Sequence, residues 1–276
     1  MGDTLLASLT SVLEQLNDEF EVLVVDDDSI DSTQTILEEL KLEYKNLVTL
    51  HLGHDKNRRL GFTRNTSLKH ARGEWCIFHI DMDDQIGPHI IDFVKTVEVI
   101  NSKFSRDLLF SGQQIHMAKR TFLIENGPFR NIYRGEDRDL YQRLAFSEQW
   151  ITIIHKRFIH RLPRSKKLLL KKVIRDSWDQ MVTDLQMDPS PIKYLFESAV
   201  RLRNLGLVRI LFRFFFVPYA LITAYLRGIL DTSKRINNYE DFAIYRKSNS
   251  FTLSEWTKRL LINETELKGI DRKIFY

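Results

Sequence analysis

The residues from Asp81 to Asp84, three of which are acidic, directly follow the apolar run from Trp75 to Ile80. An apolar run between polar residues predicts a buried strand, so the acids should emerge at the carboxyl edge of a sheet, where open α/β sheets bind ligands. Crowded carboxylates repel each other unless a cation lies between them, and Mg²⁺ or Mn²⁺ bridges carboxylates to phosphates. The pattern predicts a metal and a phosphorylated ligand, with a turn of solvated acids as the alternative.

Two further groups of acids stand at the ends of predicted elements. Asp26, Asp27 and Asp28 follow a strand predicted over residues 22–25, where carboxylates can accept hydrogen bonds from ribose hydroxyl or base N–H groups. One helix cap needs only one such side chain, so the surplus acids favour ligand binding. Glu136 and Asp137 open another predicted helix. For these two acids the alternative to a role in the site is that they complement the dipole of the helix.

Helix and strand patterns alternate along the first part of the chain. Apolar spacing predicts helices over residues 5–16, 31–40, 63–71, 88–100 and 135–145, and strands over residues 22–25, 48–52, 75–80 and 151–155. The segment 107–134 shows mixed signals. Such β-α-β-α-β alternation predicts an α/β fold with a mostly parallel sheet flanked by helices and a ligand crevice beyond the strand ends.

The bulk composition narrows the class of protein. A chain of 276 residues is long enough for one domain with an appendage, and we place a boundary between a sheet domain at 1–163 and a helical region at 164–276. A net charge of +4 is too small and dispersed to indicate a nucleic-acid partner, although Lys and Arg concentrate between Lys156 and Arg175. The single cysteine, Cys76, excludes an internal disulfide framework and fits a reducing, cytoplasmic compartment.

Taken together, these separated segments resemble the family 2 glycosyltransferases of the GT-A fold. The order and spacing of the segments are those of the family, and it is their conjunction that makes the resemblance specific. The matching strings are Val24–Thr33, Gly61–Asn65, Gly73–Trp75 followed by Asp81–Asp84, and Gly135–Leu140 followed by Arg143 and Leu144. The resemblance covers roughly residues 5–163. It implies a nucleotide-sugar donor and a divalent metal, Mn²⁺ or Mg²⁺.

The resemblance also implies a role for each matching residue. It assigns Asp83 and Asp81 to the metal and Asp137 to the general base, with Glu136 beside it to bind or position the acceptor. Asp84 receives no role. The implied reaction is direct displacement with inversion at the anomeric carbon, in which the metal stabilises the leaving diphosphate. The implied nucleotide contacts are Asp26, Asp27, Arg64, Asp81 and Met82.

The chain departs from the family pattern at its start and at single positions. Family members begin with a strand that touches the nucleotide base, whereas this sequence starts at the following helix, so we expect a strand to be absent from the middle of the sheet. Asp28 stands where the family usually has glycine, which predicts a positive φ. These departures keep an alternative open, a truncated and catalytically impaired sugar-nucleotide-binding protein at the membrane surface. For His155 and His160 we expect structural or surface roles, and the alternative is that His160 and Arg161 touch the diphosphate or the acceptor.

Residues 205–230 are strongly apolar. The charge-free part, residues 214–226, would extend only about 20 Å as a helix, short of the ~30 Å hydrocarbon core of a bilayer. Arg209, Arg213 and Arg227 fall on one narrow helical face, which predicts a helix in the membrane interface with its arginines toward lipid phosphates. The alternatives are a helix packed on the catalytic domain or a dimer contact. A membrane-facing helix would favour a polyprenyl-lipid acceptor over a glycan and a peripheral location at the inner membrane face.

Overall fold

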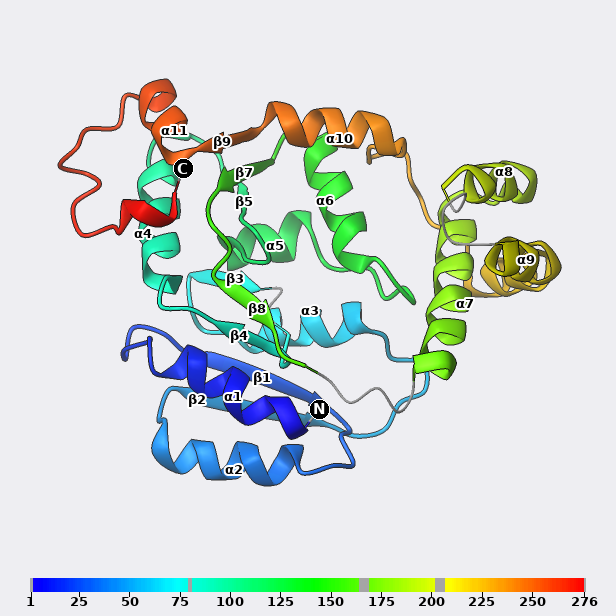
Figure 1. Ribbon diagram of the computed structural model, residues 1–276, viewed down its shortest axis with the longest axis horizontal. Helices are drawn as coiled ribbons and strands as arrows, with labels where there is room; N and C mark the ends of the chain where they lie inside the picture. Colours follow the sequence, from blue (N-terminus) through cyan, green and yellow to red (C-terminus); the bar gives the residue numbers. More distant parts are fainter. Residues whose placement is uncertain (1, 79–80, 164–168, 202–206, 276) are drawn as a thin grey trace.

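The computed structural model describes residues 2–78, 81–163, 169–201 and 207–275 (Figure 1). Its first unit is a parallel pair of strands, β1 (Val22–Asp27) and β2 (Leu47–Leu52), joined by α2 (Thr33–Glu43) and preceded by α1 (Gly2–Leu13). The leucines of the two helices recur every three or four residues, which places them on one face of each helix. This face packs with the strands in an apolar cluster formed by Leu5, Leu9, Leu13, Val24, Leu37, Leu40 and Leu47.

A second sheet has five strands in the order β3-β6-β5-β7-β9. Its strands are β3 (Trp75–Phe78), β5 (Leu109–Ser111), β6 (His116–Lys119), β7 (Trp150–Ile154) and β9 (Ser250–Thr252). β6 runs antiparallel to both neighbours, whereas β5, β7 and β9 are parallel. A short connection between β5 and β6, closed by a bond from Gly112 N–H to the Ile115 carbonyl (2.7 Å), allows only antiparallel pairing. The predicted α/β class is confirmed, with a more mixed sheet than the alternation suggested.

Within the described residues, the two sheets are separate and no strand pairs with the second edge of β1. α1 instead lies against the segment that carries the acidic run, since Thr4 Oγ1 donates to the Met82 carbonyl (2.9 Å) and Ser11 Oγ accepts from Ile86 N–H (3.0 Å). The acidic run is therefore held from α1. A short strand, β4 (Asp84–Ile86), follows it and pairs antiparallel with β8 (Ile159–Arg161).

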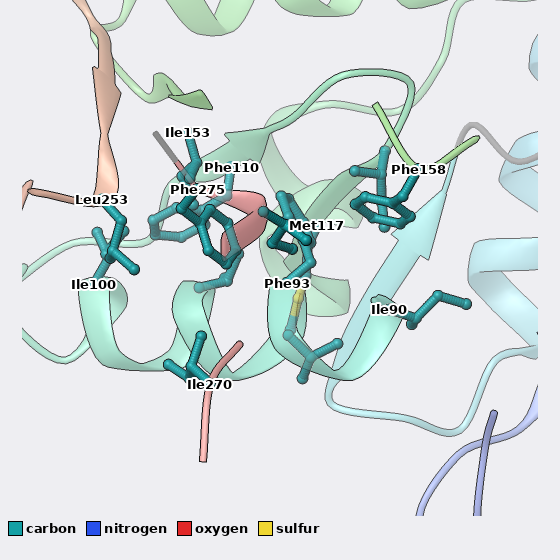
Figure 2. Close-up of a cluster of buried hydrophobic side chains, with 14 of the residues drawn as sticks. Ile90, Phe93, Ile100, Phe110, Met117, Ile153, Phe158, Leu253, Ile270 and Phe275 are labelled. Carbon is teal, nitrogen blue, oxygen red and sulfur yellow. The ribbon is translucent and has the colours of Figure 1, made fainter. Parts of the chain in front are cut away.

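The remaining helices cover the sheets. α3 (Leu60–His70), α5 (Arg120–Asn126) and α6 (Glu136–Phe146) lie around the five-stranded sheet (Figure 1). α4 (Ile90–Asn101) lines the main core, which Figure 2 shows in close-up. The C-terminal residues complete that core with Leu253, Ile270 and Phe275. They follow α10 (Tyr239–Ser248) and belong to α11 (Leu253–Leu260) and the segment after it, which ends in a short 3₁₀ turn at Arg272–Ile274.

The division of the chain at residue 163 stays a prediction, but the part after it is not only helical. β9 joins the sheet beside β7, and α11 packs on the main core. Between these parts, α7 (Leu169–Met187), α8 (Pro191–Arg201) and α9 (Leu207–Arg227) form a separate group on one side of the molecule (Figure 1). In the basic stretch between Lys156 and Arg175, residues 164–168 and the side chains of residues 169–173 lie outside the described part of the chain, as do residues 79 and 80.

The arginine face of α9 packs inward. The guanidinium carbon of Arg213 lies 5.5 Å from the ring centre of Tyr194, and that of Arg227 lies 4.0 Å from the ring centre of Tyr133. The same face carries small residues that pack on α7, namely Val217, Ala220 and Ala224. Each of these guanidinium groups therefore lies over an aromatic ring, with Arg213 half-buried and Arg227 exposed. That the arginines point to lipid phosphates stays a prediction. The Arg209 side chain lies outside the described residues.

The opposite face of α9 is apolar and exposed. Its side chains include Phe214, Phe215, Tyr219, Ile222 and Leu226, each more than half exposed. In the described part of the chain, no helix is both long and apolar enough to cross a membrane.

Candidate functional site

The acidic run forms a cluster of carboxylates at the start of β4. One oxygen from each of Asp81, Asp83 and Asp84 lies within 4.8 Å of the others. Asp83 and Asp84 are buried, whereas Asp81 is half-buried. The sequence predicted the first two as metal ligands, and the structure adds Asp84, which had received no role. Its signal was the buried strand itself, because Asp84 opens β4 and the pleat turns its side chain inward.

Arg161 lies against all three carboxylates. Its Nη1 is 2.5 Å from Asp83 Oδ1, its Nη2 is 3.1 Å from Asp81 Oδ2, and its Nε is 3.0 Å from Asp84 Oδ1. The antiparallel register of β4 and β8 places it directly opposite Asp84. The sequence offered His160 and Arg161 only as possible diphosphate or acceptor contacts, so this ion-pair network was missed.

The donor set of the cluster fits a hard divalent cation. Three carboxylates offer the oxygen ligands that Mg²⁺ and Mn²⁺ prefer. Burial raises the pKa of Asp84, and the charges of Asp81 and Asp83 add to this rise while Arg161 opposes it. The cluster of three carboxylates therefore carries excess negative charge, and a cation reduces the repulsion between the carboxylates. Arg161 provides that charge here, and a metal ion would share or displace its contacts.

Arg64 and Glu136 form the second half of the site. Arg64 Nη1 lies 3.3 Å from Glu136 Oε1, and both side chains are largely buried. Burial raises the pKa of Glu136, and the charges of Asp137 and Asp81 raise it further against the opposing effect of Arg64. The charge of Asp81 is the smallest of these effects, so the acidic run lies within electrostatic reach of the start of α6.

The local sequence explains how Arg64 reaches Glu136. The Asn65 side chain donates to the Phe129 carbonyl (2.7 Å) and accepts from Phe129 N–H (2.8 Å), which pins α3 to the loop before α6. A Cβ on Gly61 would lie 2.1 Å from the Arg130 carbonyl oxygen, so only glycine permits this approach. Gly135 adopts a φ of 80°, a left-handed turn that starts α6 at Glu136. Gly61, Gly135 and Asn65 together thus position Arg64 against Glu136.

The acidic side chains at the end of β1 already have partners within the protein. Asp26 is buried, and its carboxylate contacts His51 Nδ1 (2.9 Å) and accepts from Ser29 N–H (3.2 Å). Burial raises the pKa of Asp26, but these hydrogen bonds outweigh it, so the net pKa is lowered. Asp27 pairs with Arg58 Nη1 at 2.5 Å. Asp28 has a φ of 60°, as predicted from its place in the motif.

His155 is a structural residue, as predicted. Its Nε2 accepts from Gln113 N–H (2.7 Å), and its Nδ1 lies 2.7 Å from the Lys156 carbonyl. Burial lowers the pKa of His155, which keeps the ring neutral. His160 is exposed on β8. Met82 is partly buried against the cluster formed by α1 and α2.

Comparison with known proteins finds glycosyltransferases that are similar to parts of the chain. Residues 2–103 match the model of glycosyl transferase family 2. The chain is 34% identical over 87 residues to the poly(ribitol-phosphate) beta-glucosyltransferase of Bacillus spizizenii, covering 31% of this chain and 13% of that protein. It is 38% identical over 81 residues to the putative glycosyltransferase EpsH of Bacillus subtilis, covering 29% and 22%. The chain thus spans less than a quarter of the length of either relative.

The fold has a solved counterpart. The mannosyltransferase PcManGT from Pyrobaculum calidifontis, solved in complex with GDP-Man and Mn²⁺, superimposes with a TM-score of 0.52 at 15% identity, covering 84% of this chain and 85% of that chain. At this identity, the likeness concerns the fold. Over residues 2–103 the chain is thus similar to glycosyl transferase family 2, and its fold is of the GT-A type.

Proposed function

We propose that the chain is a metal-dependent, inverting glycosyltransferase that moves a sugar from a UDP- or GDP-sugar to an acceptor hydroxyl or a lipid phosphate. The observation that carries this proposal is the cluster of the carboxylates of Asp81, Asp83 and Asp84, which lies within electrostatic reach of the Arg64–Glu136 pair. Asp81 from the acidic run acts electrostatically on Glu136, which Arg64 contacts at 3.3 Å. A cation-binding carboxylate cluster beside a buried acid is what transfer from a nucleotide diphosphate requires.

Each residue then has a separate task. A divalent ion held by Asp81, Asp83 and Asp84 would act as a Lewis acid on the leaving diphosphate. Arg64 offers a planar fork for phosphate oxygens, and its contact with Glu136 fixes its position. Asp137, next to Glu136 at the start of α6, takes the proton of the acceptor. Asp26 and Asp27 line the nucleotide side at the end of β1.

The names of similar proteins support the donor and the metal. A mannosyltransferase of this fold was solved with GDP-Man and Mn²⁺, and one relative is a glucosyltransferase acting in the poly(ribitol-phosphate) class. GDP-Man belongs to the proposed class of donors. The alternative, a catalytically impaired protein that binds a sugar nucleotide, is favoured by the separation of the two sheets at β1.

We also propose that the protein works peripherally at the inner, cytoplasmic face of a membrane. The support is the exposed apolar face of α9, which combines aromatic and aliphatic side chains on a helix too short to span a bilayer. A polyprenyl-lipid or glycan acceptor would meet the site there.

Calorimetric titration with UDP and GDP, each with and without Mn²⁺, tests the donor site. We expect Mn²⁺-dependent binding of one of the two nucleotides. Asp137→Asn should abolish transfer and leave nucleotide binding unchanged, because it removes the proton acceptor alone. Asp92→Asn on α4 serves as the control. Absence of nucleotide binding in all four titrations would contradict the proposed transferase function. Nucleotide binding without turnover in the wild type would favour the alternative, a catalytically impaired protein that binds a sugar nucleotide.

A further inference from the structure

Two histidines lie against the acidic side chains at the end of β1. The parallel register of β1 and β2 pairs Asp26 with His51, so their side chains share one face of the two-stranded sheet at its carboxyl edge. His51 Nδ1 lies 2.9 Å from Asp26 Oδ2, and His54 Nδ1 lies 3.2 Å from Asp28 Oδ2. Both pairs therefore lie on the proposed nucleotide side of the site.

The exposed member of the first pair is the histidine. The Asp26 side chain is only 4% exposed, whereas that of His51 is 48% exposed. Both oxygens of the Asp26 carboxylate also have partners in the protein, because Oδ1 accepts from Ser29 N–H (3.2 Å) and Oδ2 contacts His51. A ligand at this edge therefore meets the ring of His51, and Asp26 acts on the ligand through that ring.

The contact with Asp26 decides which nitrogen of His51 carries the proton. Burial raises the pKa of Asp26, but its hydrogen bonds outweigh burial, so the carboxylate is ionised at neutral pH and can only accept. Nδ1 of His51 must therefore donate, and the neutral ring then presents Nε2 as an acceptor. The amide nitrogen of Gln34 also lies 2.9 Å from Nδ1, but the charged carboxylate dominates over a neutral amide.

One apolar cluster connects this edge of the sheet to the acidic run. Val24 stands two positions before Asp26, on the same face of β1, and belongs to the cluster formed with α1 and α2. Met82, inside the acidic run, packs against the same cluster, and Thr4 Oγ1 on α1 donates to its carbonyl (2.9 Å). The His51–Asp26 pair and the carboxylates proposed to hold the metal therefore adjoin the same cluster.

An exposed acceptor on the nucleotide side selects one part of a sugar nucleotide. The ionised diphosphate offers only acceptors, which a neutral ring presenting Nε2 does not bind. The nucleoside half offers donors, namely the ribose hydroxyl groups and the ring N–H of the base, N3–H in uracil and N1–H in guanine. The tautomer of His51 therefore matches the nucleoside half of the donor.

We propose that His51 binds the nucleoside half of the donor through Nε2, which accepts from the base N–H or from a ribose hydroxyl, and that Asp26 is the positioning residue for its ring. This inference rests on the proposed transferase function and deepens it. It replaces a direct contact between Asp26 and the nucleotide by a contact made through His51. His54 forms the same kind of pair with Asp28 but is 80% exposed and follows the end of β2, so it offers a matched control.

Calorimetric titration of the full chain with UDP and with GDP, in the presence of Mn²⁺, tests the contact. For the nucleotide that binds, His51→Leu should bind it roughly three- to tenfold more weakly than the wild type, because one hydrogen bond is lost. His51→Gln keeps an acceptor oxygen and should recover part of the affinity. His54→Leu should bind like the wild type.

Modified nucleotides identify the group that donates to Nε2. N3-methyl-UDP and N1-methyl-GDP lack the base N–H, and the 2′-deoxy and 3′-deoxy nucleotides each lack one ribose hydroxyl. The analogue without the true donor should bind the wild type roughly three- to tenfold more weakly than its parent. The same analogue and its parent should bind His51→Leu equally. Ratios that are the same in the wild type and in His51→Leu for every analogue overturn the proposal.

Nitrogen-15 NMR of the His51 ring tests the role of Asp26 without a ligand. In the neutral ring of the wild type, the shifts of the two nitrogens should show the proton on Nδ1. In Asp26→Asn they should move toward the average of the two tautomers, and the affinity for the nucleotide should fall as in His51→Leu. A merely structural role of Asp26 would leave the His51 shifts unchanged. A wild-type ring with its proton on Nε2 contradicts the proposed acceptor.

The outcomes separate this proposal from the transferase function. If the wild type binds neither UDP nor GDP, with or without Mn²⁺, both proposals are wrong. If a nucleotide binds but His51→Leu binds it as tightly as the wild type, the transferase function stands and the role of His51 is overturned. The same conclusion holds if His54→Leu loses as much affinity as His51→Leu, because the loss then reflects the acidic edge as a whole.

Discussion

Arg161 Nη1 lies 2.5 Å from Asp83 Oδ1, and the pairing of β4 with β8 brings these two residues together from positions 78 apart in the sequence. The same guanidinium contacts Asp81 and Asp84. A protein side chain therefore supplies positive charge at the carboxylate cluster where we propose a metal ion. Arg161 and a divalent cation must compete for, or share, these oxygens.

Replacing Arg161 should strengthen metal binding. In Arg161→Gln the three carboxylates lose their cation, so we expect the affinity for Mn²⁺ to rise at least about tenfold, because partly exposed ion pairs of up to ~1 kcal/mol each no longer oppose the metal. The melting temperature without metal should fall, and Mn²⁺ should restore it. Calorimetry and thermal melts with and without Mn²⁺ check both effects. Arg72→Gln, an exposed pair with Glu21, is the control. Unchanged Mn²⁺ affinity would contradict this account.

Gly61→Ala should destabilise the protein. The new methyl group would lie 2.1 Å from the Arg130 carbonyl oxygen, which is backbone and cannot move away alone. Overpacking of this kind costs about 2 kcal/mol, which corresponds to a melting temperature lower by roughly 5 °C in a chain of this size. Gly53→Ala is the matched control, because nothing lies within 4 Å of its Cβ position. Equal melting temperatures for the two variants would show that α3 is not held as described.

Glu136→Gln should stabilise the protein at neutral pH. Burial raises the pKa of Glu136 above its value in the unfolded chain, about 4.3. The unfolded chain therefore ionises first as the pH rises, and the folded state loses stability between the two pKa values. The melting temperature of the variant should exceed that of the wild type at pH 7.5, and the difference should shrink toward zero near pH 4. Glu125→Gln, on an exposed helix end, is the control. A difference independent of pH would count against the raised pKa.

Acidification should weaken the fold through His155. Burial lowers the pKa of its imidazole below the unfolded value of about 6.5. The neutral His155 ring therefore makes its full contribution to the free energy of unfolding above that pKa. This contribution is lost as the pH falls through it, because the unfolded chain takes up the proton first. Denaturant unfolding at pH 7.5 and pH 5.5 should show a smaller change for His155→Gln than for the wild type. His70→Gln, exposed at the end of α3, should keep the wild-type change. The same change in His155→Gln and the wild type would exclude His155 as its source.

The exposed face of α9 should decide membrane binding. Phe214→Ser, Tyr219→Ser and Leu226→Ser combined should reduce flotation with anionic vesicles at least about tenfold, since each large apolar side chain contributes up to ~1.5 kcal/mol when buried. Leu42→Ser, an exposed apolar residue on α2 that is 90% exposed, is the matched control. If the triple variant floats like the wild type, α9 does not bind lipid.

The sequence alone determined the local elements and the similarity to glycosyl transferase family 2. The apolar periods of α1, α4 and β3 and the turn residues around α3 and α6 act over a few positions, so their effects can be read without a structure. Gly61 and Asn65, in the matching string Gly61–Asn65, could also be recognised from the sequence, and so could the positive φ of Asp28. The family match over residues 2–103 follows from the same residues.

Tertiary structure decided which of these residues meet and which face each helix turns inward. Arg161 reaches the acidic run only because β8 pairs with β4 in one register, which is set by strand pairing across the fold. The α9 arginines form one face in the sequence, but whether that face meets lipid or protein depends on the small residues that pack it against α7. β9 reaches the sheet beside β7 from 96 positions further along the chain, as the separation of Ser250 from Ile154 shows. Such pairings are fixed by long-range packing, and no local period reports them.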